Sequence, residues 1–400
     1  MTRLWLTYDK FKNDYWPHFP QNWTKGLDPA MIFSELMGVI LGSEAALESK
    51  HSHLDRDAYL AFRPRLASST SEAQKSRIYD LFERYLEEKR RTGDLDVADR
   101  TRMLLEDFRR NGVPGQKVDF LYVDEVQDNL LVDTLLLRSI CHNRDGLFWA
   151  GDTAQSISAG SSFRFKELKA FLHRVEGRNS DKQLQIAQSM RSVPPKMFQL
   201  TTNYRSHAGI VNCARTIVET ITKLWPGSID KLQPERATVD GLKPMFFDNW
   251  DADNVQRSQF LFGDQTSGAR IDFGAQQCIL VRDKEAKERL ERIVGNIGIV
   301  MSLYDSKGLE FNDILLYDFF ADSEVEESQW RVVLNMVVKD LNAPTPDIVK
   351  HASVCMELKF LYVAVTRARN NLWIADSSTK GEPMRVSSRV LPAVSVLTFV

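Results

Sequence analysis

The chain has 400 residues, of which 43% are hydrophobic and 26% charged; its net charge of −2 gives no basic excess that would indicate nucleic-acid binding. This length allows two or three domains with a large core. No apolar run approaches the ~18 residues needed to cross a membrane, and the four cysteines are scattered without metal-ligand spacing, so we expect an intracellular protein with reduced thiols.

The first 112 residues are predicted to be helical. Asp28 as N-cap and Pro29 at the first helical position begin one helix, which Gly42 ends. Apolar stripes indicate two more helices, one ending at Gly93 and one over residues 97–108. Residues 14–23 are rich in aromatic side chains and proline. We predict a packed loop there, with base stacking by the aromatic rings as the less favoured alternative.

Residues Val118–Ser158 carry the strongest functional pattern. Short apolar runs at Phe120–Val123 and Leu147–Ala150 end in Asp124-Glu125 and Gly151-Asp152. We predict two strands of a parallel α/β sheet, which binds ligands at its carboxyl edge. Adjacent carboxylates at such an edge commonly hold Mg²⁺ and polarise a water beside a nucleotide triphosphate. A bare acidic pair would indicate a solvated turn, but the longer strings DEVQD and GDTAQS favour the nucleotide site.

A polar stretch, Glu176–Pro195, is the predicted domain boundary. Beyond it, strands alternate with helices, which indicates a second parallel sheet. The predicted strands are Phe198–Thr202 and residues 244–250, 277–282, 298–303, 313–320 and 371–376; the predicted helices are Ala208–Leu224, Lys284–Ile293, Ser353–Val365 and one near Gln329–Leu341. The tail from Ser377 is left without an assignment.

Five strings occur in the order DEVQD, GDTAQSI, TTNYRSH, SLYDSKGLEF and LYVAVTRAR. Together they resemble the UvrD/Rep-type superfamily 1 helicases over Val118–Asp376, with the helicase-like core of large TPR- and ankyrin-repeat-containing proteins as the most similar subgroup. The resemblance implies two RecA-like α/β domains of the P-loop NTPase type. The first would be incomplete and carry a helical insertion. The implied boundaries are 1–112 for the insertion, 113–195 for the rest of the first domain, 196–376 for the second domain and 377–400 for the tail.

The resemblance also implies roles around ATP and Mg²⁺ in the first domain. Asp124 would hold Mg²⁺, and Glu125 would activate the attacking water. Gln155 would sense the γ-phosphate, and the nucleotide site would be completed by Gln127, Asp128 and Asp152.

In the second domain, the resemblance implies that Arg205 and Arg367 reach the γ-phosphate, with Arg367 as the arginine finger. Glu310 would contact the nucleotide sugar. Phosphoryl transfer requires such positioned cations around the charge that develops on the phosphate. The alternatives are an exposed Arg205 at a helix start and an Arg367 paired with Glu357 or a nearby carboxylate.

Two segments of the family pattern are missing. The chain has no Gly-Lys pair, so it lacks the phosphate loop GxxxxGK[ST] and its Mg²⁺-binding hydroxyl. Either the chain is a fragment whose upstream segment supplies this loop, which the retained acids and arginines favour, or it is a shortened paralogue without ATP hydrolysis. The large accessory insertion before the SLYDSKGLEF string is absent as well. Within that string, Tyr304 and Asp305 stand where relatives often have histidine and a small residue.

We therefore predict an ATP-dependent DNA helicase or translocase that moves on single-stranded or partly duplex DNA, by resemblance with 3′-to-5′ polarity, with RNA as an open alternative. A nuclear location is favoured over a cytoplasmic one. The rival prediction is a non-catalytic nucleic-acid-binding or scaffold paralogue, and a third is a nucleotide switch without unwinding.

Overall fold

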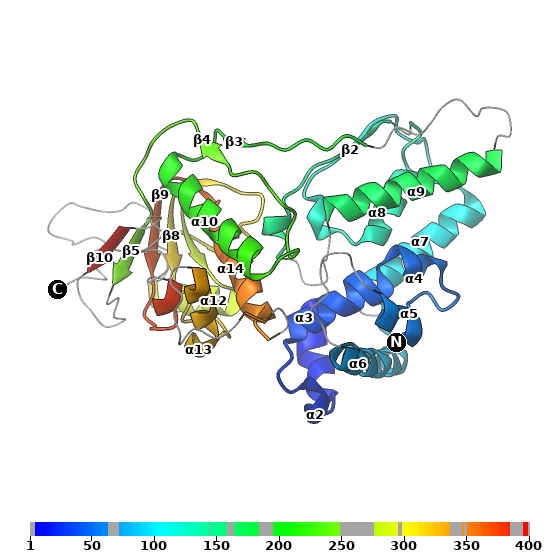
Figure 1. Ribbon diagram of the computed structural model, residues 1–400, viewed down its shortest axis with the longest axis horizontal. Coiled ribbons are helices and arrows are strands. Elements are labelled where there is room, and N and C mark those ends of the chain that lie inside the picture. The colour runs from blue at the N-terminus through cyan, green and yellow to red at the C-terminus, as the bar shows by residue number, and fades with distance from the viewer. Residues whose placement is uncertain are drawn as a thin grey trace. The chain divides into compact units, whose positions relative to one another are not determined.

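The computed structural model describes residues 5–62, 72–143, 145–157, 164–183, 195–248, 276–294, 298–336, 346–347, 350–384 and 395–398 (Figure 1). The chain forms two compact units. Unit 1 comprises residues 1–198 together with Gly227–Asp230, and unit 2 comprises Gln199–Pro226 and the residues from Lys231 onward. The domain boundaries drawn from the sequence remain predictions within this division.

The amino-terminal part of unit 1 is helical, as predicted. Asp28 caps α3 (Pro29–Ser34) by accepting hydrogen bonds from the amides of Ala30 and Met31 at 2.7 and 3.1 Å. The helix continues as a π-helix, η3 (Glu35–Leu41), and ends at Gly42. The other helices here are α1 (Tyr8–Lys10), η1 (Phe11–Tyr15), η2 (Trp16–His18), α2 (Gln21–Thr24), α4 (Glu44–Glu48), α5 (Arg56–Ala61), α6 (Glu72–Thr92) and α7 (Val97–Asn111).

The aromatic stretch at residues 14–23 is largely helical rather than a loop, because all of it except Phe19 and Pro20 falls within η1, η2 and α2. The prediction that its rings serve packing agrees with their burial. Tyr15 and Phe19 are almost wholly buried, and they join a core that includes Phe11, Phe82 and Tyr85.

The second part of unit 1 holds a pair of parallel strands, β1 (Leu121–Val123) and β2 (Leu147–Trp149). Helices α8 (Leu131–Ser139) and α9 (Phe165–Gln183) accompany it, with short 3₁₀ turns η4 (Val126–Asp128) and η5 (Thr153–Gln155) after each strand. Trp149 packs with Leu168 and Leu172 of α9.

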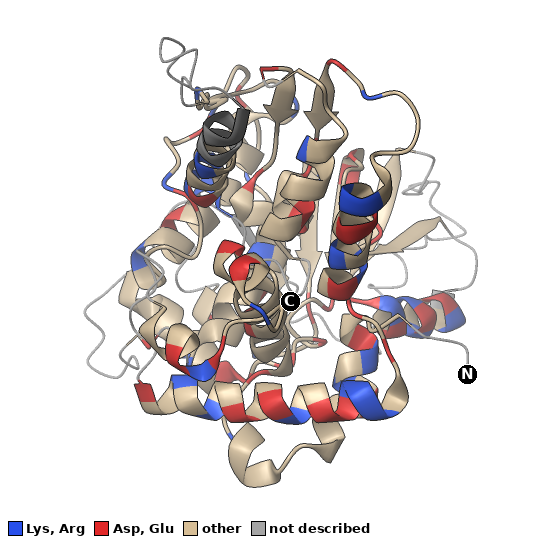
Figure 2. Ribbon diagram, turned by 90° about the vertical axis from the view of Figure 1, so that its right-hand side faces the viewer, with Lys and Arg blue, Asp and Glu red and all other residues tan. Residues whose placement is uncertain are grey.

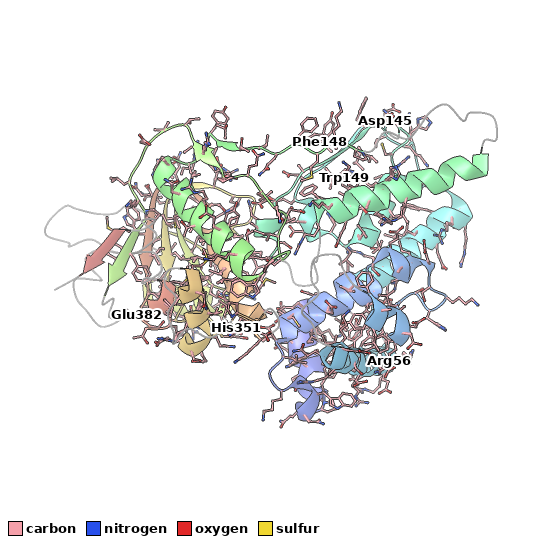
Figure 3. All side chains as sticks on the ribbon, in the orientation of Figure 1. Arg56, Asp145, Phe148, Trp149, His351 and Glu382 are labelled. Atoms are coloured by element: carbon pink, nitrogen blue, oxygen red, sulfur yellow. The ribbon has the colours of Figure 1, made fainter. Side chains whose placement is uncertain are left out.

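The outer face of this strand pair is exposed. Tyr122 and Phe148 are 74% and 55% exposed, and their rings lie 5.8 Å apart. In Figure 3, Phe148 lies on the outer side of β2, and Trp149 lies on the side of α9.

Unit 2 is built on a six-stranded parallel sheet with the strand order β10-β5-β9-β8-β6-β7. Helix α10 carries an apolar face against α14, which is buried along nearly its whole length. The strands are β5 (Met245–Asp248), β6 (Gln277–Val281), β7 (Ile299–Ser302), β8 (Phe311–Tyr317), β9 (Ala368–Ala375) and β10 (Ser395–Thr398); the helices are α10 (Ala208–Leu224), α12 (Lys284–Val294), α13 (Glu327–Trp330), η6 (Arg331–Met336) and α14 (Ala352–Val365).

Two predicted elements of unit 2 differ from the structure. The strand expected at Phe198–Thr202 is reduced to β3 (Thr202–Asn203), which pairs in parallel with β4 (Arg236–Ala237). The helix expected near Gln329–Leu341 is the short helix α13 followed by the 3₁₀ helix η6, and residues 337–341 of the expected range lie outside the described residues. The turn at Lys307-Gly308 leads into strand β8, and Gly308 adopts the left-handed φ of 79° that suits glycine.

All strand pairs in the described ranges are parallel, which confirms the predicted α/β class. Among the described residues, no helix has the length and apolarity needed to cross a membrane.

Candidate functional site

The first candidate element is the turn after β1. Glu125 has φ 50° and ψ 37°, a left-handed conformation that is uncommon for residues other than glycine and costs roughly 1–3 kcal/mol. Its amide donates to Oδ1 of Asp124 at 2.9 Å. The turn thus places two carboxylates directly beyond the strand, in a backbone shape that the surrounding contacts must hold.

Gln127 supplies those contacts. Its side chain is completely buried. Its Nε2 donates to Oε2 of Glu125, and its Oε1 accepts the backbone N–H of Asp152 at 3.0 Å. One amide side chain therefore joins the turn after β1 to the turn after β2. Gly151 is required for this link, because a Cβ atom there would overlap Oε1 of Gln127.

The turn after β2 is ordered by Asp152. Its Oδ1 accepts from the amide of Ala154 at 2.9 Å, and its Oδ2 accepts from Nε2 of Gln155 at 3.1 Å. Asp128 lies in the preceding turn, where its amide donates to the carbonyl of Glu125 at 3.0 Å. The structure thus brings together all six residues predicted for the first domain, at the carboxyl ends of two adjacent parallel strands: Asp124, Glu125, Gln127, Asp128, Asp152 and Gln155.

The chemistry of this edge fits a Mg²⁺ ion that is shared with a phosphate. In the described ranges, no group of three or more His, Cys, Asp or Glu side chains is arranged to enclose a metal ion. Nucleotide-bound Mg²⁺ needs no such cage, because one or two carboxylates suffice when phosphate and water oxygens supply the other ligands. Asp124 is the carboxylate best placed for this role, being exposed at the end of β1.

The second candidate element is a group of charged side chains in unit 2. Glu310 pairs with two arginines: its Oε2 contacts Nε of Arg205, and its Oε1 contacts Nη1 of Arg369 at 3.1 Å. The side chains of Arg205, Arg369 and Glu310 are 39–45% exposed. The sequence predicted a role for Arg205 and Glu310 but missed Arg369, although the VTRAR string places it two residues after Arg367.

Arg367 lies beside this group but is buried, with 2% of its surface exposed. Its guanidinium donates to the carbonyls of Val363 and Leu309 at 3.1 and 3.0 Å, and to Oγ1 of Thr366 at 3.2 Å. Glu357, the alternative partner considered for Arg367, forms an ion pair with Arg282 at 2.5 Å.

The NYRSH string is anchored to strand β9, which follows Arg367. Oγ of Ser206 donates to the carbonyl of Ala368 at 2.6 Å, and Nε2 of His207 lies 2.6 Å from the carbonyl of Asn370. Three of the five strings therefore form one connected cluster in unit 2: NYRSH, KGLEF and VTRAR.

Tyr304 and Asp305, which differ from the family pattern in the SLYDSKGLEF string, have clear structural roles. The ring of Tyr304 is 44% exposed and packs edge-on against Phe360 with 5.3 Å between centroids. Asp305 accepts from Oγ of Ser302 at 2.7 Å, which closes the turn after β7. In the view of Figure 2, Lys and Arg alternate with Asp and Glu along several of the helices.

Residues 28–173 match the family model of the UvrD/REP helicase N-terminal domain. The chain is 32% identical over 94% of its length to TPR and ankyrin repeat-containing protein 1 of Homo sapiens, and the match covers 13% of that protein. It is 31% identical over 38% of its length to one subunit of the ATP-dependent helicase/nuclease of Syntrophomonas wolfei, and the match covers 12% of that protein. The chain thus spans about one eighth of the length of these curated relatives.

Proposed function

We propose that this chain is part of an ATP-dependent motor that acts on single-stranded or partly duplex DNA. Its similarity to the UvrD/REP-type helicases and to the matching region of a TPR- and ankyrin-repeat protein supports the proposal. ATP and Mg²⁺ are the proposed cofactors, and the nucleus is the proposed compartment. Within the chain, the proposed nucleotide-site residues are those of the DEVQD and GDTAQS turns together with Arg205, Glu310 and Arg367.

One observation carries the proposal: the buried amide of Gln127 ties the strained, acidic turn at Glu125 to the turn at Asp152. A solvated acidic turn needs no left-handed glutamate and no buried amide bridge. Strained backbone that is held by its surroundings is typical of positions where pre-organised side chains do chemistry. Here the pre-organised groups are a carboxylate suited to Mg²⁺ and a second one suited to orienting a water.

The second candidate function is a non-catalytic nucleic-acid-binding or scaffold module. Arg367 favours it, because its guanidinium serves backbone carbonyls in the structure. The 400 residues also contain no GxxxxGK[ST] string. We therefore expect weak ATP binding and little turnover from this chain by itself.

Titration with a fluorescent ATP analogue, with and without Mg²⁺, tests the nucleotide site. We expect binding that depends on Mg²⁺ and that Asp124→Asn weakens. Asp145→Asn is the matched control, because Asp145 is exposed in the same unit but precedes β2 instead of following it (Figure 3). Equal effects of the two substitutions, or binding indifferent to Mg²⁺, would contradict the proposal.

Anisotropy of labelled single-stranded DNA and RNA distinguishes the two functions. A motor predicts that the affinity for the strand changes when Mg²⁺ and the ATP analogue are added. A scaffold module predicts strand binding that the nucleotide leaves unchanged. A Glu125→Gln variant should keep nucleotide binding and lose whatever turnover the wild-type chain has, because only the water-orienting carboxylate is altered.

A further inference from the structure

A short segment, Gly227–Asp230, belongs to unit 1 although the residues on both sides of it belong to unit 2. We call this segment the strap. It follows the end of α10, where Trp225 is buried and Gly227 turns the chain with φ 88°. The chain thus enters unit 1 for four residues and leaves it again.

The strap is held in unit 1 at three points. The guanidinium of Arg164 donates from Nε and Nη2 to the carbonyl of Gly227 at 3.1 and 3.0 Å, and also to the carbonyl of Ser228. Oδ2 of Asp230 accepts the amide of Phe165 at 3.0 Å. The amide of Asp230 donates to Oγ1 of Thr153 at 2.9 Å.

The bond between Asp230 and Thr153 is buried, and the other contacts of the strap are partly buried. Asp230 is 5% exposed, Ile229 is 4% exposed and Thr153 is 1% exposed. Asp230 receives the amide at the first residue of α9, a 19-residue helix whose positive end stabilises a carboxylate. Burial raises the pKa of the neighbouring Glu167, with Asp230 adding to the rise and Arg164 opposing it, so these charges interact in one place.

The contact to Thr153 reaches the candidate nucleotide site. Thr153 is the first residue of η5, the 3₁₀ turn that Asp152 caps and that ends at Gln155. At its other end, the strap is joined through α10 to the NYRSH string, since α10 begins three residues after Arg205. The strap is therefore the one stretch of chain in the described ranges that both bonds to the GDTAQS turn and continues directly from the helix next to Arg205.

We propose that the strap is a positioning element that holds the GDTAQS turn and couples its state to helix α10, with Thr153 and Asp230 as the positioning residues. The coupling would act through the chain and the hydrogen bond between Asp230 and Thr153. A shift of about 1 Å in the strap would break this hydrogen bond, because its geometry tolerates only a few tenths of an ångström. An effect of the strap on nucleotide and strand binding rests on the proposed function, whereas its hold on the GDTAQS turn and its link to α10 do not.

Hydrogen exchange on the whole chain tests whether the strap holds the GDTAQS turn. Thr153→Val keeps the side-chain shape and removes the oxygen that accepts from Asp230, whereas Thr153→Ser keeps that oxygen. We expect the valine variant to raise exchange roughly fivefold in peptides covering both 227–230 and 151–157, which is the effect of one lost hydrogen bond. The serine variant should stay near wild type. Equal exchange in the valine variant and the wild type, or a change confined to one of the two segments, would overturn the proposal.

A two-glycine insertion distinguishes coupling to α10 from a merely local role of the strap. Two glycines placed between Pro226 and Gly227 leave every contact of the strap available but loosen its link to α10. Coupling predicts that exchange of residues 151–157 rises roughly twofold or more, because the added residues release the strap from the restraint that α10 places on it. A local staple predicts no change, and that result would refute the coupling.

The strand-binding assay supplies the functional readout. In the wild type, the ratio of strand affinities with and without the Mg²⁺-bound ATP analogue measures the coupling between sites. The insertion should bring this ratio close to one while each ligand still binds. If the wild-type ratio is already one, the proposed motor function fails, and the exchange experiments still decide whether the strap holds the turn. An unchanged ratio in the insertion variant counts against the strap alone.

Discussion

Replacement of Gly151 by alanine tests whether the bridge between the two acidic turns is as tight as described. The added Cβ would approach Oε1 of Gln127 more closely than 3.0 Å, a distance that real Cβ atoms do not fall below, and would lie 3.2 Å from Cγ1 of Val126. Val126 and Gln127 are completely buried, so neither has free space to move into. We therefore expect Gln127 to lose its bonds to Glu125 and to the amide of Asp152.

The magnitude follows from these two bonds. A neutral hydrogen bond contributes about 0.5–1.5 kcal/mol, and one to a charged group contributes about 1.5–3 kcal/mol. The bridge includes one of each kind, so its loss should cost roughly 2–4 kcal/mol, a range that overpacking of a filled interior also reaches. We expect the melting transition of unit 1 to fall by several degrees, and the Mg²⁺-dependent binding of the ATP analogue to be lost with it.

A double variant separates the clash from other effects. Gln127→Ala removes both the bridge and the atom that the new Cβ meets, so adding Gly151→Ala to it should cost little more. Calorimetry and nucleotide titration on the wild type, the two single variants and the double variant complete the cycle. A Gly151→Ala protein that melts with the wild type and binds the nucleotide normally would refute the reasoning, as would costs that simply add.

Three further predictions concern stability and charge. Asp96→Ala should destabilise unit 1 by about 3 kcal/mol in chemical denaturation, because Asp96 is fully buried and pairs with Lys89 at 2.5 Å, whereas removal of an exposed ion pair costs far less. Arg367→Ala should destabilise unit 2 by roughly 2–4 kcal/mol, whereas Arg205→Ala should stay within about 0.5 kcal/mol of wild type. Arg205 is therefore the better position for testing a role in turnover. Equal melting temperatures for both variants would contradict the buried hydrogen bonding of Arg367. Burial raises the pKa of Asp322 to about 6, so the folded chain holds this proton more tightly than the unfolded chain. The stability that the protonated carboxyl contributes is therefore lost as the pH rises from about 4 through 6. Over that pH range, the melting temperature of Asp322→Asn should rise relative to that of the wild type, and a constant difference between about pH 4 and 7.5 would count against this prediction.

The sequence predicted best those elements whose signals are local. Helix α10 has the bounds that its apolar stripe indicated, and α3 begins at the Asp28 cap and continues to the predicted stop at Gly42. The parallel sheets followed from strands that alternate with helices. These features depend on residues that lie close together in the chain.

The features that sequence reasoning missed depend on distant partners. The strand expected at Phe198–Thr202 is short because its partner β4 has only two residues, more than thirty positions later. Likewise, the acids of the DEVQD string were identified by their order, but nothing in that order shows that Gln127 reaches Asp152 or that Glu310 lies between two arginines. The residues of the candidate site were therefore predictable, whereas the bonds that connect them were not.

The aromatic outer face of β1 and β2 has a practical consequence for every experiment described above. With Tyr122 and Phe148 turned to solvent, the purified chain should adhere to itself and to hydrophobic dyes, and the degree of self-association should rise with protein concentration. Such association can imitate cooperative ligand binding, since each added ligand would then meet a changing mixture of single and clustered chains. Tyr122→Lys provides a reference protein in which a titration curve reports the ligand alone.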